Sequence, residues 1–204
     1  MKIICIGRNY ADHAKELKND LPTEPVIFLK PDTALLRPGQ DFYIPRFSED
    51  VHFEAELVVR INRVGKYIEE KFAHKYYSEV TLGIDFTARD VQQKLKEKGL
   101  PWEKAKAFDG SAALGTMMDI KKLNKPIHDL RFQLTQNGET RQRGHTADMI
   151  FSVDKLISYT SQFFTLKIGD LIYTGTPAGV GKVSSGDTLS LFLENDECLK
   201  VVVK

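Results

Sequence analysis

Two glutamates two residues apart, Glu54 and Glu56, are the first residues whose types and spacing point to chemistry. They lie in the stretch 51–60 (VHFEAELVVR), where alternation and β-branched residues predict a strand. Because side chains alternate faces along a strand, His52, Glu54 and Glu56 point to one side, with the glutamate backbones about 6.5–7 Å apart. If that face is buried, the carboxylates repel each other unless a cation lies between them. A divalent metal ion is the simplest such cation.

The same spacing also fits an edge strand whose acidic face is exposed to water, and on spacing alone this is the commoner arrangement. The two glutamates therefore need further partners before they indicate a metal site. His52 shares their face, but a hard cation bound through oxygen has little need of imidazole. We expect His52 to support the site or the fold.

His13 and Glu16 form a second candidate pair, on a short amphipathic helix predicted over residues 11–19. Residues three apart on a helix share a face and can touch. A carboxylate bound to an imidazole fixes its tautomer and raises its basicity, as a general base for water requires. A surface ion pair has the same spacing, so the residues alone leave both roles open.

Composition excludes several classes of function. The 204 residues fit a single domain, 1–204, and 42% hydrophobic with 28% charged residues excludes a membrane protein and a disordered one. The net charge of +1 leaves no basic surface for nucleic acid or an acidic membrane. Cys5 and Cys198 suggest neither a disulfide framework nor a zinc site. Without a signal-peptide pattern, the expected location is the cytoplasm.

Strand patterns dominate the remaining chain, and few of them are separated by helices. Asn137-Gly138, between two alternating segments, predicts a two-residue hairpin turn. These features favour a mixed sheet or barrel-like roll of the α+β class with peripheral helices. The predicted strands are 2–6, 26–29, 51–60, 81–84, 131–135, 139–143, 171–174, 188–193 and 198–203, and one helix is predicted over 152–163.

A further helix is predicted directly after Asp85, which ends the strand 81–84. Thr87 followed three residues later by Asp90 fits a capping box, so Thr87 is the expected N-cap. Arg89 and Gln92 then share one face of the opening turns.

The glycine-rich run 175–182 does not match a phosphate-binding loop. Thr176 lies where that motif needs glycine, and Val183 lies where it needs serine or threonine. The run instead predicts a turn after the strand 171–174, whose backbone NH groups and Thr176 could line a pocket for a small anion.

A series of short motifs spans nearly the whole chain: GRNYADH at 7–13, FLKP at 28–31, HFEAEL at 52–57, DFTARD at 85–90, GLPW at 99–102, KAFD at 106–109, DMIF at 148–151 and TGTPAGVG at 174–181. Together, and in this order, they resemble the fumarylacetoacetate hydrolase family. The chain starts at the GRNY stretch, which resembles the small members of the family, the acylpyruvases and oxaloacetate decarboxylases.

The resemblance implies a mixed β-roll of the α+β class, usually a homodimer. It places the metal ligands on Glu54, Glu56 and Asp85, and ligation by oxygen alone implies Mg²⁺ or Mn²⁺, with Ca²⁺ as an occupant in preparations. The other site residues that it implies are the catalytic Lys106 and the His13/Glu16 dyad, and the substrate-contacting Arg89, Gln92 and Thr176.

The expected reaction is metal-dependent C–C cleavage of a small β-keto acid, either acylpyruvate hydrolysis or oxaloacetate decarboxylation. Charge on the departing pyruvate enolate would be held by the metal and Lys106. In hydrolysis, water activated by His13 and Glu16 would attack the distal carbonyl, and Arg89 or Gln92 would orient the distal end.

Two alternatives remain. The first is an isomerase or hydratase of unsaturated or enolisable 2-oxo acids, such as a 2-hydroxyhepta-2,4-diene-1,7-dioate isomerase or an oxaloacetate tautomerase. The second is a non-catalytic, metal-stabilised binding protein for oxo acids, which gives the His13/Glu16 pair no role. In each case the partner is a small oxo acid, and neither nucleic acid nor a membrane is expected.

Overall fold

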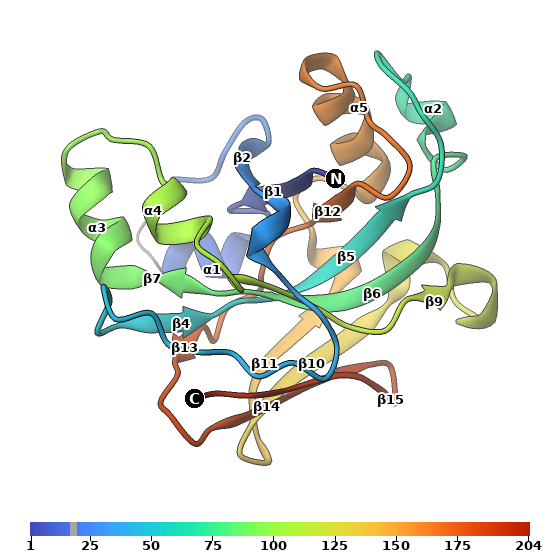
Figure 1. The fold of residues 1–204 in the computed structure, drawn as a ribbon. Helices are drawn as coiled ribbons and strands as arrows, with labels where there is room; N and C mark the ends of the chain where they lie inside the picture. The colour runs from blue at the N-terminus through green and yellow to red at the C-terminus, as the bar shows by residue number, and fades with distance from the viewer. Residues whose placement is uncertain (17–19) are drawn as a thin grey trace.

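The largest sheet runs through the middle of the molecule in a computed structural model that describes residues 1–16 and 20–204 (Figure 1). Its strands pair in the order β2-β1-β12-β5-β6-β8-β3, and β9 pairs with the start of β6. Parallel and antiparallel pairs both occur, so the sheet is mixed. The strands are β1 (Ile3–Gly7), β2 (Val26–Lys30), β3 (Leu35–Leu36), β5 (Ala55–Ile61), β6 (Tyr77–Asp85), β8 (Ala112–Leu114), β9 (Met118–Asp119) and β12 (Leu171–Tyr173).

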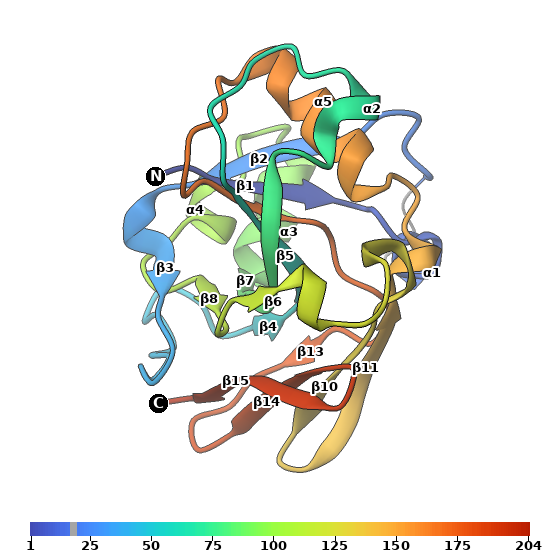
Figure 2. The ribbon, with the colours of Figure 1, turned by 90° about the vertical axis from the view of Figure 1, so that its right-hand side faces the viewer.

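Two smaller sheets complete a half-barrel, which confirms the predicted α+β roll. The order β11-β10-β14-β15 forms a layer beneath the large sheet (Figure 2), and β13-β4-β7 forms the third sheet. One apolar cluster joins the layers, since it contains Leu57 and Leu82 of the large sheet and Leu134 and Leu191 of the four-stranded sheet. The strands are β4 (Val51–Phe53), β7 (Thr87–Ala88), β10 (Arg131–Gln136), β11 (Glu139–His145), β13 (Gly181–Lys182), β14 (Thr188–Leu193) and β15 (Asp196–Val202).

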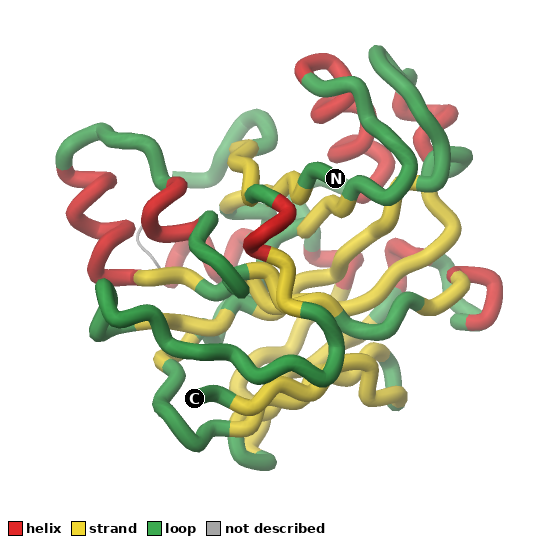
Figure 3. The backbone as a smooth tube through the Cα atoms, in the orientation of Figure 1, coloured by secondary structure: helices red, strands yellow, loops and turns green. Residues whose placement is uncertain are grey.

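The helices lie around the sheets, as Figure 3 shows. The predicted helix 11–19 is present as α1 over its first six residues, and 17–19 lie outside the described residues. No helix in the described ranges is long and apolar enough to cross a membrane. The helices are α1 (Ala11–Glu16), α2 (Glu70–Ala73), α3 (Arg89–Glu97), α4 (Glu103–Lys106) and α5 (Val153–Phe163), with 3-10 turns at Asp32–Ala34, Ile120–Lys122, Ile127–Asp129 and Thr146–Asp148.

The strand predicted over 51–60 is interrupted at Glu54. Before the break, β4 pairs with β7 and β13; after it, β5 lies between β6 and β12 in the interior of the large sheet. Glu54 and Glu56 are only 5% and 1% exposed. The edge-strand explanation of the two glutamates is therefore wrong, because neither carboxylate faces bulk water.

The predicted cap at Thr87 is also wrong. Helix α3 begins at Arg89 with Ala88 as N-cap, and no side chain caps it. Thr87 belongs instead to β7, and its hydroxyl accepts a 2.6 Å hydrogen bond from Nζ of Lys106. The hydroxyl oxygen thus binds a buried ammonium group. This hydrogen bond outweighs the local preference of Thr87 for a helix cap.

The hairpin prediction at Asn137-Gly138 is confirmed. These residues connect β10 to β11 with φ of 55° and 83°. Two successive positive φ angles are typical of a type I′ turn, whose twist matches that of the flanking strands.

Gly83 in β6 provides a test of how tightly the sheet that carries the site is packed. A Cβ here would lie 2.6 Å from Cε1 of Tyr173 and 2.7 Å from the backbone oxygen of Ala113, which cannot rotate away. We expect Gly83→Ala to lower the free energy of unfolding by about 1–3 kcal/mol. Gly7→Ala is the matched control, because its nearest neighbour would be 3.7 Å away. Urea unfolding of both variants measures the difference, and equal stabilities would contradict this packing.

Candidate active site

Three carboxylates from two neighbouring strands converge at the junction between β4 and β5. Glu54 occupies the junction, Glu56 lies two residues on in β5, and Asp85 ends β6, with its backbone NH donating to the carbonyl oxygen of Glu54 at 2.8 Å. One oxygen from each carboxylate lies within 4.8 Å of the others. We call this set the carboxylate triad. The structure brings together the three carboxylates that the resemblance to a family implied as metal ligands.

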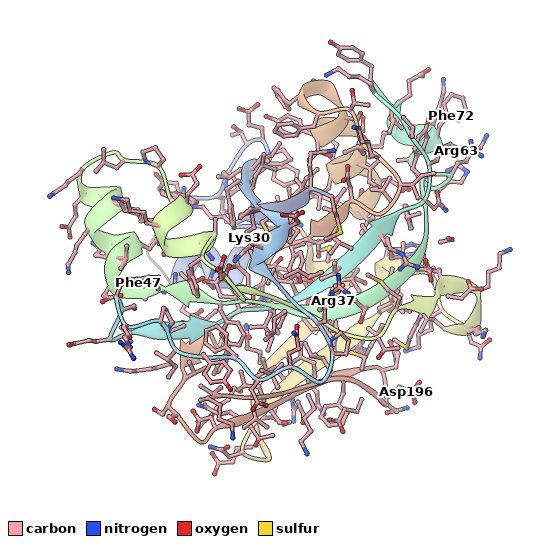
Figure 4. All side chains as sticks on the ribbon, viewed as in Figure 1. Lys30, Arg37, Phe47, Arg63, Phe72 and Asp196 are labelled. Carbon is pink, nitrogen blue, oxygen red and sulfur yellow. The ribbon has the colours of Figure 1, made fainter. Side chains whose placement is uncertain are left out.

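Two buried lysines neutralise much of the triad's charge. Nζ of Lys106 donates to Glu54 and Asp85, both at 2.8 Å. Nζ of Lys30 lies 2.7 Å from the other oxygen of Asp85, near the centre of the molecule (Figure 4). Burial lowers the pKa of Lys106, but the carboxylates of Asp85 and Glu54 raise it by more, so its side chain stays an ammonium ion. Lys106 is therefore a cation that donates hydrogen bonds to two members of the triad.

The two glutamates of the triad differ in how well their charge is compensated. Burial raises the pKa of Glu54, but Lys106 and Arg89 lower it by more, so the net shift is downward. For Glu56, burial and then the charges of Asp85 and Glu54 raise the pKa well above its usual value, against a 2.7 Å hydrogen bond from the NH of Gly175. A divalent cation among the three oxygens would supply the missing positive charge, and this all-oxygen donor set fits Mg²⁺ or Mn²⁺.

His13 faces the same pocket as the triad and is bonded to Glu16. Nδ1 of His13 lies 3.2 Å from Oε2 of Glu16, and His13 is only 5% exposed. The Glu16 carboxylate also accepts hydrogen bonds from the NH of Gly179 at 3.1 and 3.3 Å, which ties α1 to the glycine-rich run. The imidazole is buried in the pocket wall, whereas the Glu16 carboxylate is exposed, so the pair connects the pocket to the surface.

Arg89, Gln92 and Thr176 complete the predicted set. The guanidinium of Arg89 donates to Gln92 at 2.7 Å and to Glu54 at 2.5 Å, so the α3 pair does share a face toward the triad. The hydroxyl of Thr176 donates to the carbonyl of Ala55 at 2.8 Å. All predicted site residues except Glu16 line one pocket, and Glu16 contacts it through His13. The residues that line this pocket are Ile6, Gly7, Arg8, His13, Phe28, Glu54, Glu56, Asp85, Arg89, Gln92, Lys96, Trp102, Lys106 and Thr176.

Several functional neighbours were missed from the sequence. Lys30 lies in the FLKP motif and Arg8 in the GRNY motif, so membership of these motifs could have marked both residues as site candidates. Gln142 gave none: it lies in a hairpin strand of mostly exposed residues, yet its side chain is buried. Its amide accepts from the NH of Ala55 at 2.9 Å and donates to the Thr176 hydroxyl at 2.8 Å, which fixes the strand break beside the triad.

His52 does not join the site. Its Nε2 lies 3.1 Å from Asp50, and the side chain does not line the pocket. Burial and then the positive charge of Arg89 lower the pKa of His52. The expectation of a supporting or structural role agrees with this position.

The fold and the site together define a β-roll protein with a buried carboxylate triad beside a His–Glu pair. Residues 2–203 match the model of the fumarylacetoacetate (FAA) hydrolase C-terminal family, and the chain belongs to this family.

Named relatives cover most of the chain. The mitochondrial oxaloacetate tautomerase of Mus musculus is 43% identical over 202 residues, 99% of this chain and 91% of the relative. An oxaloacetate tautomerase of Escherichia coli K12 is 45% identical over 190 residues, 93% and 87% of the two chains. Among solved structures, fumarylpyruvate hydrolase of Pseudomonas aeruginosa in complex with Mn²⁺ and pyruvate has a TM-score of 0.93 and 36% identity, covering 100% of this chain and 89% of its own.

Glu56→Gln tests the triad as a cation site without recourse to activity. With a chelator present, we expect the variant to be at least as stable as the unchanged protein, because a neutral amide replaces a buried carboxyl whose ionised form Asp85 and Glu54 disfavour. With Mg²⁺ or Mn²⁺ at about 100 times its dissociation constant, the unchanged protein should gain roughly 2–3 kcal/mol and the variant much less.

Thermal unfolding with and without EDTA measures both effects. Glu139→Gln, which removes an exposed carboxylate, is the control and should keep the full metal response. An equal metal response in Glu56→Gln would show that the ion binds elsewhere.

Proposed function

We propose that this protein is an enzyme that moves a proton on a small, enolisable 2-oxo acid, and that keto–enol tautomerisation is its leading reaction. The observation that carries the proposal is that a buried histidine bonded to Glu16, a buried carboxylate triad and a buried ammonium group meet at one pocket. A non-catalytic binding protein would need the cation site but not the His13/Glu16 pair.

Glu54, Glu56 and Asp85 would hold the metal ion. A bound Mg²⁺ or Mn²⁺ would supply a Lewis acid for the carboxylate and 2-oxo oxygen of the substrate. The pocket side of the triad is where these two oxygens would enter.

His13 is the proposed base. With Nδ1–H donating to Glu16, the lone pair of Nε2 is available to the pocket, and the negative charge of Glu16 stabilises the imidazolium formed when it takes a proton. In tautomerisation, His13 would take the proton from C3, and a proton would return to the 2-oxo oxygen. The keto acid then becomes its enol with no change in composition.

Lys106 and the α3 residues would hold the charge and orientation of the substrate. The Lys106 ammonium lies between Glu54 and Asp85, so it is fixed before the substrate arrives and needs little reorganisation as negative charge develops on oxygen. Arg89, Gln92 and Thr176 line the same pocket and are the proposed substrate contacts.

C–C cleavage is the second candidate function, because it also forms a 2-oxo acid enolate: loss of the group on C3 leaves the enolate of pyruvate. Two relatives named as oxaloacetate tautomerases are more similar to this chain than the relative named fumarylpyruvate hydrolase, which favours proton transfer over cleavage. In cleavage, His13 would activate water against the distal carbonyl of an acylpyruvate; in decarboxylation, CO₂ would leave from oxaloacetate and no water would be needed. A homodimer and a cytoplasmic location stay predictions.

A turnover screen tests the proposal. Oxaloacetate and short acylpyruvates are each mixed with the protein and Mg²⁺ or Mn²⁺, with and without chelator. Tautomerisation changes the enol absorbance without releasing pyruvate, whereas cleavage releases pyruvate with CO₂ or a carboxylic acid. Absence of both in every mixture would refute the proposed function.

His13→Gln should lower kcat by about 10²–10⁴-fold, because the amide cannot accept the substrate proton. The metal-induced gain in melting temperature should remain, since His13 is not a triad member. His128→Gln, an exposed histidine away from the pocket, is the control and should change kcat by less than about twofold. Unchanged turnover in His13→Gln would rule out this residue as the base.

A further inference from the structure

Large apolar side chains are exposed together at the end of the molecule that carries α2 and α5. They come from the loop after β5 and from the end of α5 and the stretch that follows it, and both lie at the top of the molecule in Figures 1 and 2. Gly65 and Leu166 exchange two backbone hydrogen bonds, at 3.0 and 2.8 Å, which hold the two segments side by side. The exposed apolar residues are Val64 (58%), Tyr67 (72%), Phe163 (55%) and Ile168 (70%).

Exposed cations without carboxylate partners lie at the same end. The nearby Glu69 and Glu70 already pair with Lys71 at 2.7 Å and with Lys155 at 3.8 Å. In the part of the chain that the structure describes, no carboxylate lies within ion-pair distance of the remaining cations here, which are Arg63, Lys66, Lys75 and Lys167. We call these four cations and the four exposed apolar residues the apical patch. The net charge of +1 for the whole chain does not reveal this local excess.

The cations of the patch lie close to aromatic rings. Nζ of Lys66 is 5.0 Å from the ring centroid of Tyr67, and Nζ of Lys75 is 4.9 Å from that of Phe72. Figure 4 shows Phe72 and Arg63 at the same edge of the molecule, far from Lys30 in this view. Positive charge and exposed apolar surface are therefore combined in one region.

The backbone under Tyr67 is fixed. Its φ of 53° lies in the left-handed region, which is unfavourable for a residue with a side chain and persists only where the surroundings enforce it. The NH of Tyr67 donates to the carbonyl of Ser161 at 3.0 Å, and the NH of Ile68 donates to Oγ of Ser161 at 2.8 Å. Helix α5 thus holds the loop that exposes the ring, and binding through this ring needs little further ordering of the chain.

The chemistry of the patch fits a lipid bilayer with anionic headgroups. Cations attract such headgroups, tyrosine favours the membrane–water interface, and aliphatic side chains are buried at the boundary with the acyl chains. A two-fold dimer through the patch would instead bring its uncompensated cations against the same cations of a second copy. Single-stranded nucleic acid would use the cations and the ring of Tyr67, but it would give Val64 and Ile168 nothing to stack on.

We propose that the apical patch docks this protein on an anionic membrane surface. Val64, Tyr67 and Ile168 enter the headgroup region, and the four cations bind the anionic headgroups around them. This inference is independent of the proposed function, and it departs from the expectation drawn from net charge, which averages over the whole surface. Helices α3 and α4, which line the active-site pocket, lie on the opposite side of Figure 1 from α2, so docking leaves them away from the membrane.

Vesicle cosedimentation tests the docking surface. Phosphatidylcholine vesicles with about 30 mol% phosphatidylserine should bind the unchanged protein at least about tenfold more tightly than pure phosphatidylcholine vesicles do. The double variant Arg63→Gln/Lys167→Gln should bind the anionic vesicles about 25-fold more weakly, because each cation near an anionic surface contributes about fivefold. Tyr67→Asn should bind them about tenfold more weakly, because asparagine tolerates the positive φ and only the ring is lost.

Matched controls remove the same groups outside the patch. Tyr43→Asn removes a ring that is 71% exposed beside the C-terminus, which lies toward the bottom of Figures 1 and 2. Lys98→Gln/Lys200→Gln removes two exposed lysine charges, so its net charge equals that of the double variant of the patch. Both controls should bind the anionic vesicles as the unchanged protein does.

The proposal is overturned if the unchanged protein does not bind the anionic vesicles, or if the patch variants bind them as tightly as the controls. It is also overturned if Tyr67→Asn loses affinity for a single-stranded oligonucleotide, or for a second copy of the chain in sedimentation, while its affinity for the vesicles is unchanged.

Discussion

Repulsion among three buried carboxylates is the constraint on which the rest of this structure depends. Glu54, Glu56 and Asp85 are almost completely shielded from water, and their oxygens lie within 4.8 Å of one another. Such a group is stable only if positive charge surrounds it. Lys106 and Lys30 provide part of that charge from positions that are themselves buried, and each would be unfavourable there without the triad. The carboxylates and the lysines therefore stabilise each other, but burial and the neighbouring carboxylates still raise the pKa of Glu56, whose ionised form a metal ion would favour.

The interrupted strand makes this arrangement possible. If 51–60 were one continuous strand, Glu54 would continue the ladder of the large sheet. Because of the break, β4 pairs with β7 in the three-stranded sheet instead of extending β5. Glu54 therefore lies beside Asp85 at the junction. Gln142 bonds to the NH of Ala55 at the break, where a strand partner would otherwise be required. A disruption of regular pairing thus supplies the geometry of the site.

Sequence reasoning found the residue types of the site but not all of their surroundings. Alternation placed Glu54 and Glu56 on one face, and helical spacing paired His13 with Glu16, but neither pattern carries information about burial. Local patterns could not predict the burial of these side chains, because burial depends on strands that are distant in the chain. Only the resemblance to a family pointed to a shared site. Thr87 shows most clearly how far local patterns can predict the structure. Its pattern fits a helix cap, yet its hydroxyl accepts a hydrogen bond from the buried Lys106. Arg8 and Lys96, which line the same pocket, were missed because their proximity exists only in three dimensions.

The origins of the site residues have a consequence for how the protein folds. The pocket combines α1, the β4–β5 junction, the end of β6, α3, α4 and the run after β12, so contacts of long sequence separation dominate it. Topologies of this kind fold slowly, because loop-closure entropy is lost before the contacts form. A chain that ends before Thr176 lacks part of the pocket lining. A cation that binds the triad would accordingly act on the last step of folding, slowing global unfolding rather than speeding the first collapse.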